Sequence, residues 1–277
     1  MIIETTAPDF FPEGVTLDAD DNFYIGSMNT GAIHEAAANA TESESFIEPD
    51  KANNWSRCSA CTLTTRRKRC GCARPMPQRP MAGKAPAALK AFDLTSGALK
   101  GSWDWPEFAT PLPVTDTKGV AGFCNDITID DAGNVYATDS WYPQILRLPA
   151  GATSTTMLEE WATSTVFPAD QWHLNGIDID RTSGVIYAVE NHPGALYSIP
   201  ILANGKSGTV KKVVTSRPLY SPDGLKVLSA GVLAIAEGQP GGMAVIEITG
   251  NKGDHFWGMA PDPVKPFRLV EVPLNQP

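Results

Sequence analysis

A motif that recurs four times along the chain constrains the fold more than any other feature of the sequence. Each copy has a polar residue, alternating apolar positions, a turn rich in Asp, Gly or Asn, and a second apolar segment. Alternation with a period of two around such a turn predicts a β-hairpin with one apolar face. The two segments of the copies cover 13–18 and 20–27, 125–130 and 132–139, 175–180 and 183–190, and 223–227 and 230–237.

The spacing of the hairpins predicts a β-propeller. The last three copies begin at Asn125, Asn175 and Asp223, which are 50 and 48 residues apart. A single hairpin cannot bury its apolar face, and units that repeat about every 40 to 50 residues bury those faces by stacking radially around an axis. Outer strands are expected at 144–148, 195–199 and 244–248. We therefore expect an all-β fold in which residues 1–277 form a single propeller domain.

The chain between the first two copies has room for one missing copy, near residue 69. The sequence of this segment is unlike the rest of the chain. No acidic residue occurs from Lys51 to Phe92, whereas seven basic residues lie between Arg57 and Arg79, together with four of the five cysteines. Clustered like charge and few apolar residues disfavour packing. We therefore expect residues 51–90 to be an aberrant, irregular segment in blade two.

Three interpretations of this segment remain open. Cys58, Cys61, Cys70 and Cys72 have a spacing that would suit a zinc site with four thiolates. The basic residues would suit an anionic partner such as nucleic acid. The third interpretation, which we favour, is a stretch translated out of frame, because codons compatible with 57–80 exist whose shifted frame encodes a hairpin like its neighbours. Resequencing the coding DNA tests this, since unavoidable stop codons in the shifted frame would exclude it.

The chain after the last copy is short. Asp223 and Pro277 are 54 residues apart, little more than one repeat, and no further copy of the hairpin motif follows. The ring therefore has five blades or an incomplete last blade, and the sequence leaves both open.

Composition excludes several classes of function. Hydrophobic residues make up 42% of the chain and charged residues 19%, so it can bury a core and is not disordered. The net charge of −9 argues against a nucleic-acid partner and is compatible with a bound cation. No apolar run approaches the roughly 18 residues of a membrane helix, and the first residues do not resemble a secretory signal. We expect no membrane partner, a monomer, and a cytoplasmic, reducing location, which the odd number of cysteines also favours.

The first residue of each copy marks the candidate site. The innermost strand of a propeller blade starts near the central channel, so Glu13, Asn125, Asn175 and Asp223 are expected to converge at one mouth. Two carboxylates and two amide carbonyls are hard ligands that suit a Ca²⁺-like ion better than zinc. Asn and Asp also commonly start strands and form turns. Four polar residues in one register nevertheless favour a site over that explanation.

The segments around these residues resemble the SMP-30/gluconolactonase/LRE-like family, which includes regucalcin and sugar lactonases. They are Phe11-Pro12-Glu13-Gly14, Phe123-Cys124-Asn125-Asp126, Leu174-Asn175-Gly176 and Ser221-Pro222-Asp223-Gly224. The resemblance covers most of the chain apart from about 51–90 and the C-terminal part. It implies a six-bladed propeller that holds one divalent metal, usually Ca²⁺, with Mg²⁺, Mn²⁺ and Zn²⁺ as alternatives.

The resemblance also implies roles for the four residues. Glu13, Asn175 and Asp223 would be metal ligands, Asn125 would contact the substrate close to the metal, and Asp223 would double as the base. The implied reaction is metal-assisted hydrolysis of a small-molecule lactone or related ester. The sequence contains no Gly-x-Ser-x-Gly nucleophile elbow and no obvious triad, so covalent catalysis is not favoured.

One departure from the family pattern concerns the substrate. Sugar-lactone members often carry an Arg two residues before the substrate-contacting Asn, and this chain has Phe123 there. An aromatic face in place of a guanidinium implies a less polar substrate than gluconolactone. Trp141 and His173 lie beside motif strands and either line the mouth or pack the blade edges. Three turn residues are expected to be structural: Asp18, Asp130 and Asp180.

Two other functions remain open. The chain could be a non-catalytic propeller that binds a ligand or a protein through the same mouth, since a fold alone does not establish an activity. It could also be a damaged copy of a family enzyme, with the site retained and blade two impaired. Metal binding without turnover of any lactone or ester would favour the first. A low, broad melting transition that is cured by restoring the reading frame would favour the second.

Overall fold

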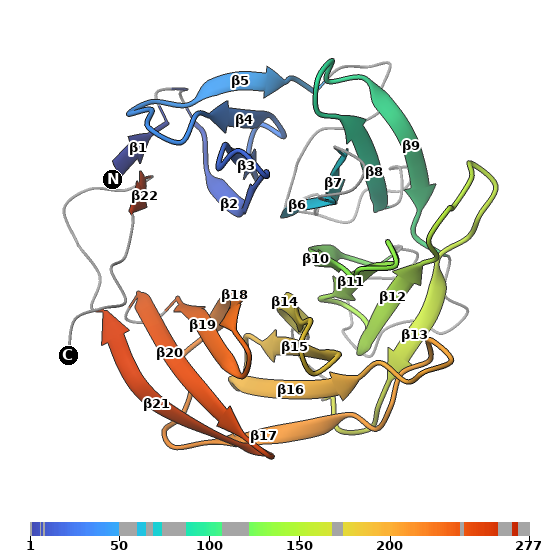
Figure 1. Ribbon diagram of the computed structural model, residues 1–277, viewed down its shortest axis with the longest axis vertical. Helices are drawn as coiled ribbons and strands as arrows, with labels where there is room; N and C mark the ends of the chain where they lie inside the picture. Colours follow the sequence, from blue (N-terminus) through green and yellow to red (C-terminus); the bar gives the residue numbers. More distant parts are fainter. Residues whose placement is uncertain are drawn as a thin grey trace.

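The structure, a computed structural model of the chain, is a ring of β-sheets around a central axis (Figure 1). It describes residues 2–5, 7, 9–49, 60–64, 69–73, 87–106, 122–167, 174–238, 241–259 and 268–270. Every regular element in these ranges is a strand, which confirms the expected all-β propeller. In the same ranges, no helix has the length and apolar character needed to cross a membrane.

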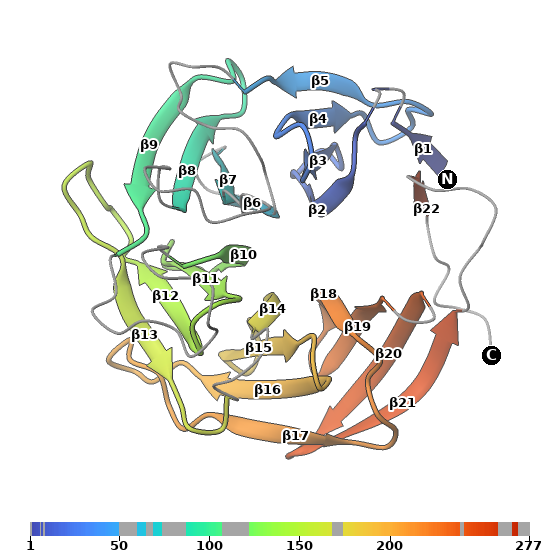
Figure 2. The same cartoon turned by 180° about the vertical axis from the view of Figure 1, so that it is seen from behind.

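Five blades of four antiparallel strands surround the axis, and each blade runs outward from an inner strand (Figures 1 and 2). Blade one is β2 (Pro12–Leu17), β3 (Phe23–Ser27), β4 (Ile33–Ala36) and β5 (Glu44–Ile47). Blade two is β6 (Ala60–Thr64), β7 (Arg69–Ala73), β8 (Ala88–Asp93) and β9 (Leu99–Asp104). Blade three is β10 (Cys124–Ile129), β11 (Val135–Asp139), β12 (Gln144–Leu148) and β13 (Glu159–Thr163). Blade four is β14 (Leu174–Asp180), β15 (Val185–Glu190), β16 (Ala195–Pro200) and β17 (Lys211–Thr215). Blade five is β18 (Pro222–Ser229), β19 (Val232–Glu237), β20 (Gly242–Thr249) and β21 (Lys252–Met259).

The four predicted hairpins are the inner two strands of blades one, three, four and five. Aspartates hold their turns as the sequence suggested. In blade three, the Asp130 carboxylate accepts hydrogen bonds from Asn134 N at 2.8 Å, Asn134 Nδ2 at 2.7 Å and Tyr136 Oη at 3.0 Å. Asp18 and Asp180 bind the backbone of their own turns in the same way. The expected outer strands are β12, β16 and β20, and a fourth strand lies outside each.

Blade two contains a hairpin where the missing copy was expected. Strands β6 and β7 pair from Ala60↔Ala73 to Thr64↔Arg69, and β7 pairs in turn with β8. These two strands form a regular ladder, and whether residues 51–90 as a whole are irregular stays a prediction. Residues 51–59, 65–68 and 74–86 lie outside the described ranges. Cys61 and Cys72 are opposite each other in the ladder, and the zinc interpretation stays a prediction.

The two ends of the described chain meet in the ring. Strand β1 (Ile2–Glu4) pairs antiparallel with β22 (Arg268–Val270), and both figures place this pair between blades one and five. Ile3 is almost completely buried there. Within the described ranges the last position of the ring thus contains two strands, in agreement with an incomplete last blade. Whether residues 1–277 form a single domain stays a prediction.

Blades four and five are joined into one sheet of eight strands. Their outermost strands, β17 and β21, pair in parallel at Val214↔Lys252 and Thr215↔Gly253. The outer edges of these two blades therefore protect each other from other strands.

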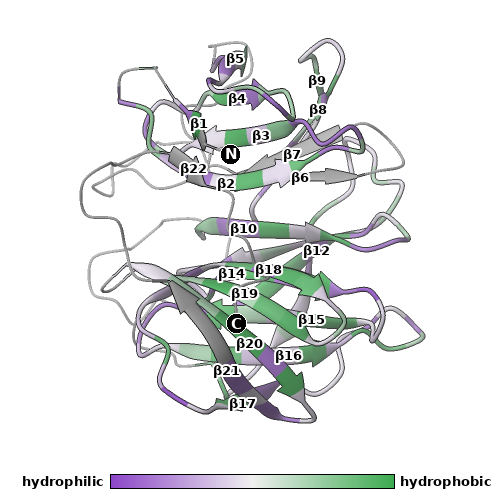
Figure 3. Cartoon of the chain, turned by 60° about the vertical axis from the view of Figure 1, so that its left-hand side comes forward, coloured by the Kyte–Doolittle hydropathy of each residue, from purple (hydrophilic) through white to green (hydrophobic). Residues whose placement is uncertain are grey.

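The hydrophobic core is divided among the interfaces between blades. Figure 3 shows hydrophobic residues concentrated along the strands and hydrophilic ones in turns and in edge strands such as β17. Tyr136, Ile145 and Ile177 belong to the cluster between blades three and four. Leu196, Leu225 and Ile235 belong to the cluster between blades four and five. Because each blade packs only on its neighbours, the inner strands are held in a fixed order around the axis.

Candidate functional site

The inner strands of blades one, three, four and five share an irregularity at the same place. After the first paired residue, three steps along the inner strand correspond to two steps along its partner. This is a β-bulge, which sharpens the local twist and changes the direction of a side chain. The residues inside the bulges are Glu13–Gly14, Asn125–Asp126, Asn175–Gly176 and Asp223–Gly224. The four predicted site residues therefore occupy one equivalent position in four blades.

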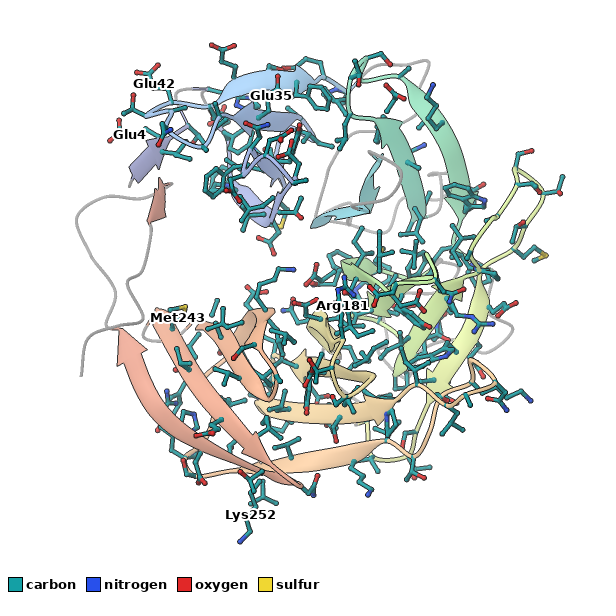
Figure 4. All side chains as sticks on the ribbon, viewed as in Figure 1. Glu4, Glu35, Glu42, Arg181, Met243 and Lys252 are labelled. Atoms are coloured by element: carbon teal, nitrogen blue, oxygen red, sulfur yellow. The ribbon has the colours of Figure 1, made fainter. Side chains whose placement is uncertain are left out.

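Asp223 is linked electrostatically to two of the other three predicted residues. The Asn175 amide acts to lower the pKa of Asp223. The charge of Asp223 in turn raises the pKa of Glu13. Electrostatic effects thus link Glu13 of blade one, Asn175 of blade four and Asp223 of blade five, and their convergence on one cation stays a prediction. Figure 4 shows side chains from these inner strands gathered around the axis.

The site disfavours negative charge. Burial, followed by the charges of Asp223 and Asp126, raises the pKa of Glu13 to about 8. The pKa of Asp223 is also raised, first by burial and then by the charge of Asp126, and the Asn175 amide offsets part of this. Carboxylates that share a poorly hydrated space repel each other, and a cation between them would remove the repulsion.

Asp126 is a third carboxylate that acts on Glu13 and Asp223, and its role was not predicted from the repeat. Its Oδ1 accepts a hydrogen bond from Ile127 N at 2.8 Å and its Oδ2 accepts one from Ile177 N at 3.1 Å. Burial raises its pKa, and the charge of Lys226 acts in the opposite direction. Asp126 is next to Asn125 in the same bulge, and its charge raises the pKa of both Glu13 and Asp223. The signal in the sequence is an acidic residue where the other three copies have glycine: Gly14, Gly176 and Gly224.

The donor set fits a divalent cation. The Oδ1 atom of Asn175 is buried and has no hydrogen-bond partner among the described residues. A buried acceptor without a partner costs about 1 to 3 kcal/mol, and a cation would satisfy it. Together with the carboxylates of Glu13 and Asp223 it forms an all-oxygen set of the kind that Ca²⁺ prefers. Throughout the described part of the chain, no three His, Cys, Asp or Glu side chains gather to form a metal site, so the set depends on the amide oxygen.

Phe123 and Trp141 form an aromatic pair beside the bulge of blade three. Their ring centroids are 5.9 Å apart, with Phe123 buried and Trp141 half-buried. Asp139 fixes both backbones, because its Oδ1 accepts hydrogen bonds from Phe123 N and Trp141 N, each at 2.9 Å. His173, the other residue predicted to contact substrate, lies outside the described residues.

The acidic residue that ends the second strand of blade three is structural. Besides these backbone bonds, the Asp139 carboxylate accepts hydrogen bonds from Trp105 Nε1 at 2.8 Å and Gln144 Nε2 at 3.0 Å. Burial raises its pKa, and the hydrogen bonds counteract that in part. With both oxygens occupied by donors, Asp139 serves as a connector that holds the aromatic pair in place.

Apolar side chains are also exposed next to the inner strands of blades one and five. Phe11, which precedes Glu13 by two residues as Phe123 precedes Asn125, is 41% exposed. Met28 lies beside it and donates a backbone hydrogen bond to Phe11 O at 2.9 Å. In blade five, Tyr220 is half exposed and lies under the Arg217 guanidinium. Three blades therefore carry apolar groups near the polar site residues.

Comparison with protein families gives one match. The family model described as the SMP-30/Gluconolactonase/LRE-like region matches residues 11–257 of the chain, which include all four bulge residues. No curated protein matches the chain by sequence.

Solved structures with similar folds have diverse activities. The chain is similar to a structure from a nidogen/laminin complex, with a TM-score of 0.65 and 15% identity over 92% of this chain and 81% of that chain. It is similar to a gluconolactonase from Xanthomonas campestris, with a TM-score of 0.61 and 14% identity over 92% of this chain and 77% of that chain. A virginiamycin B lyase from Staphylococcus aureus gives a TM-score of 0.57 and 13% identity over 96% and 89%. At these identities the likeness establishes the propeller fold alone.

Proposed function

The chain belongs to the SMP-30/gluconolactonase/LRE-like family, and from this premise we propose that it is a metal-dependent hydrolase of lactones or related carboxylic esters. One observation carries the proposal. The charge of Asp223 acts on Glu13 and the Asn175 amide acts on Asp223, so residues of three blades are linked electrostatically. The buried Asn175 Oδ1 has no hydrogen-bond partner among the described residues. A structural connector would satisfy its polar atoms internally, as Asp139 does, whereas a binding site leaves them available for a ligand.

Glu13, Asn175 and Asp223 would hold the cation. Their three oxygens make Ca²⁺ the first choice, and Mg²⁺, Mn²⁺ and Zn²⁺ are the alternatives. A cation bound there supplies a Lewis acid that polarises the substrate carbonyl and makes a water molecule more acidic.

The side chains supply the proton transfer and the orientation. Asp223 accepts a proton from the attacking water at its carboxylate, and this proton returns to the ester oxygen that leaves when the carbon–oxygen bond breaks. Asn125, in the equivalent bulge of blade three, donates its amide to a substrate oxygen. Asp126 is held by the backbone N–H groups of Ile127 and Ile177, so it contributes charge to the site without acting as the base.

The surroundings of the site favour a substrate with an apolar substituent. The half-buried Trp141, which packs on the buried Phe123, offers an aromatic surface in blade three, and Phe11 and Met28 are exposed in blade one. These groups provide apolar contact area and few hydrogen bonds, which suits an alkyl or aryl lactone better than a polyhydroxylated sugar lactone.

The test is hydrolysis of a panel of lactones and esters by the purified protein with Ca²⁺ and after chelation. We expect turnover that disappears with the metal and with Asp223→Ala, and that persists in the control Asp130→Asn, which alters a hairpin turn. Hydrolysis that survives both chelation and Asp223→Ala would overturn the mechanism. Metal binding without turnover of any lactone or ester would instead identify a binding propeller.

A further inference from the structure

Blade three holds the backbone of blade four on both sides of Gly176. The Thr138 hydroxyl donates to the Asn175 carbonyl oxygen at 2.6 Å, and the Asp126 carboxylate accepts from Ile177 N at 3.1 Å. At Leu174, the residue before Asn175, the carbonyl oxygen accepts a hydrogen bond from the Ser140 hydroxyl at 2.7 Å. Consecutive backbone groups of β14 are thus fixed by side chains of the neighbouring blade.

The bulge makes these contacts necessary. Leu174 pairs with Glu190 and the next pair is Ile177 with Ala188, so Asn175 and Gly176 fall between two rungs of the β14–β15 ladder. Backbone polar groups that a bulge releases need other partners when they are buried. Thr138 supplies one, and its own hydroxyl oxygen accepts a hydrogen bond from Asp126 N at 3.0 Å. The Asp126 carbonyl oxygen, at 3.3 Å, is a longer alternative acceptor than the Asn175 carbonyl oxygen at 2.6 Å.

A hydroxyl group at this position occurs in blade three only, among the four blades that carry the bulge. The residues at the same ladder position in the other three blades are Gly26, Val189 and Ala236. Thr138 is completely buried, and burying a hydroxyl is unfavourable unless it is hydrogen-bonded. The other three blades fold without a hydroxyl group at this position, so the hydroxyl of Thr138 has a role specific to the interface between blades three and four.

We propose that Thr138 is a positioning residue for Asn175. By accepting the Thr138 hydrogen bond, the Asn175 carbonyl oxygen fixes the backbone conformation of Asn175 and so the orientation of its side chain. The Oδ1 atom of that side chain has no partner among the described residues. The role of Thr138 in metal binding rests on the proposed function. Its effect on the orientation of the Asn175 side chain is independent of that function.

Thr138→Val removes the hydroxyl group and keeps the branched shape. The matched control is Thr128→Val, because Thr128 is also buried in blade three and also donates a hydroxyl to blade four, to Asp178 Oδ1 at 2.9 Å. Both variants therefore lose a hydroxyl hydrogen bond across the same interface, and only Thr138→Val loses a bond to Asn175. Calorimetric titration with Ca²⁺ measures affinity, and the side-chain amide signals of Asn175, assigned with Asn175→Asp, report its environment without metal.

We expect Thr138→Val to weaken Ca²⁺ binding about five- to tenfold and Thr128→Val to leave it within about twofold. In the metal-free protein, the Asn175 amide signals should shift in Thr138→Val and stay in place in Thr128→Val. Equal effects of both variants on affinity and on these signals would overturn the assignment and leave Thr138 with a merely structural role.

A second pair of variants tests the proposal if Thr138→Val folds poorly. Thr138→Ser and Thr138→Ala both remove the methyl group, and only the serine keeps the hydroxyl, so rescue by serine alone supports the assignment. If the wild-type protein binds no divalent cation and hydrolyses nothing, the proposed function fails. The Asn175 amide signals in the metal-free variants still decide the positioning role.

Discussion

Gly176 and Asp223 lie in contact across the interface between blades four and five. A Cβ atom added to Gly176 would be 2.2 Å from the Asp223 carbonyl oxygen and 2.6 Å from Leu225 N, so no side chain fits there without a shift of β18. Glycine at this position therefore allows the strand that carries Asn175 to approach the strand that carries Asp223. Two of the proposed metal ligands depend on this close approach.

Gly176→Ala is expected to destabilise the protein by about 1 to 3 kcal/mol and to weaken binding of Ca²⁺, because the added methyl group separates blades four and five. Urea unfolding in the presence of a chelator measures the first effect and calorimetry the second. Gly224→Ala is the control for stability, since its Cβ would have only Ala236 Cβ near it, at 3.9 Å. Equal stability of the two variants would show that the close contact does not restrict the interface.

Asp223→Asn is expected to raise the stability of the metal-free protein at pH 7 while lowering kcat/KM for hydrolysis by about 10² to 10⁴. The gain in stability follows from the raised pKa of Asp223, because an ionised carboxylate beside Asp126 in a buried site opposes folding. Thermal unfolding in chelator and steady-state kinetics measure the two effects. A loss of metal-free stability would mean that the Asp223 carboxylate contributes favourable contacts that outweigh the repulsion.

Addition of Ca²⁺ to the metal-free protein is expected to raise its melting temperature, because a ligand that binds only the folded state stabilises it. At a free concentration of 100 times Kd the gain is about 2.7 kcal/mol. Glu13→Gln should remove most of this gain. A series with Ca²⁺, Mg²⁺, Mn²⁺ and Zn²⁺ ranks the metals, and unchanged melting with all four would contradict a metal site at Glu13.

Trp141→Ala is expected to lower kcat/KM about tenfold for lactones with an alkyl or aryl substituent, because the aromatic pair with Phe123 loses one ring. The same variant should change kcat/KM for small unsubstituted lactones much less. The ratio between the two substrate classes, measured on one preparation, corrects for any loss of active protein. A uniform decrease for both classes would place Trp141 in a structural role.

Glu237→Gln is expected to destabilise the protein by about 2 kcal/mol at pH 7 and by progressively less as the solution is acidified. Glu237 is buried, and Arg217 donates to both of its oxygens, at 2.8 and 2.6 Å. Burial acts to raise its pKa, and the hydrogen bonds from Arg217 and Tyr220 N outweigh this, so the pKa lies below the ordinary value of 4.5.

The direction of this pH effect follows from the lowered pKa of Glu237. The ionised carboxylate stabilises the folded state at pH values above about 4.5, and its contribution disappears as the pH falls through the folded-state pKa. Urea unfolding of both proteins between pH 7 and pH 3 should therefore show converging stabilities. A difference that is independent of pH would mean that charge is not the source of the stabilisation.

The local structure of the chain could be predicted from the sequence. A hairpin is specified by residues close together in the chain, so alternating apolar residues around turns such as Asp18 and Asp130 were enough to predict eight inner strands. Their common register was enough to place Glu13, Asn125, Asn175 and Asp223 in equivalent positions before their surroundings were known.

Contacts between blades were decided by the tertiary structure, because they join residues that are far apart in the chain and follow no repeat. Pairing of β1 with β22, pairing of β17 with β21, the approach of Asp126 to Glu13, and the hydrogen bond from Thr138 to Asn175 all belong to this group. A periodic pattern shows which face of a strand is buried, but it does not identify the neighbour that covers that face. The pattern could therefore indicate which residues meet at the axis, and only the packed ring shows which groups hold them there.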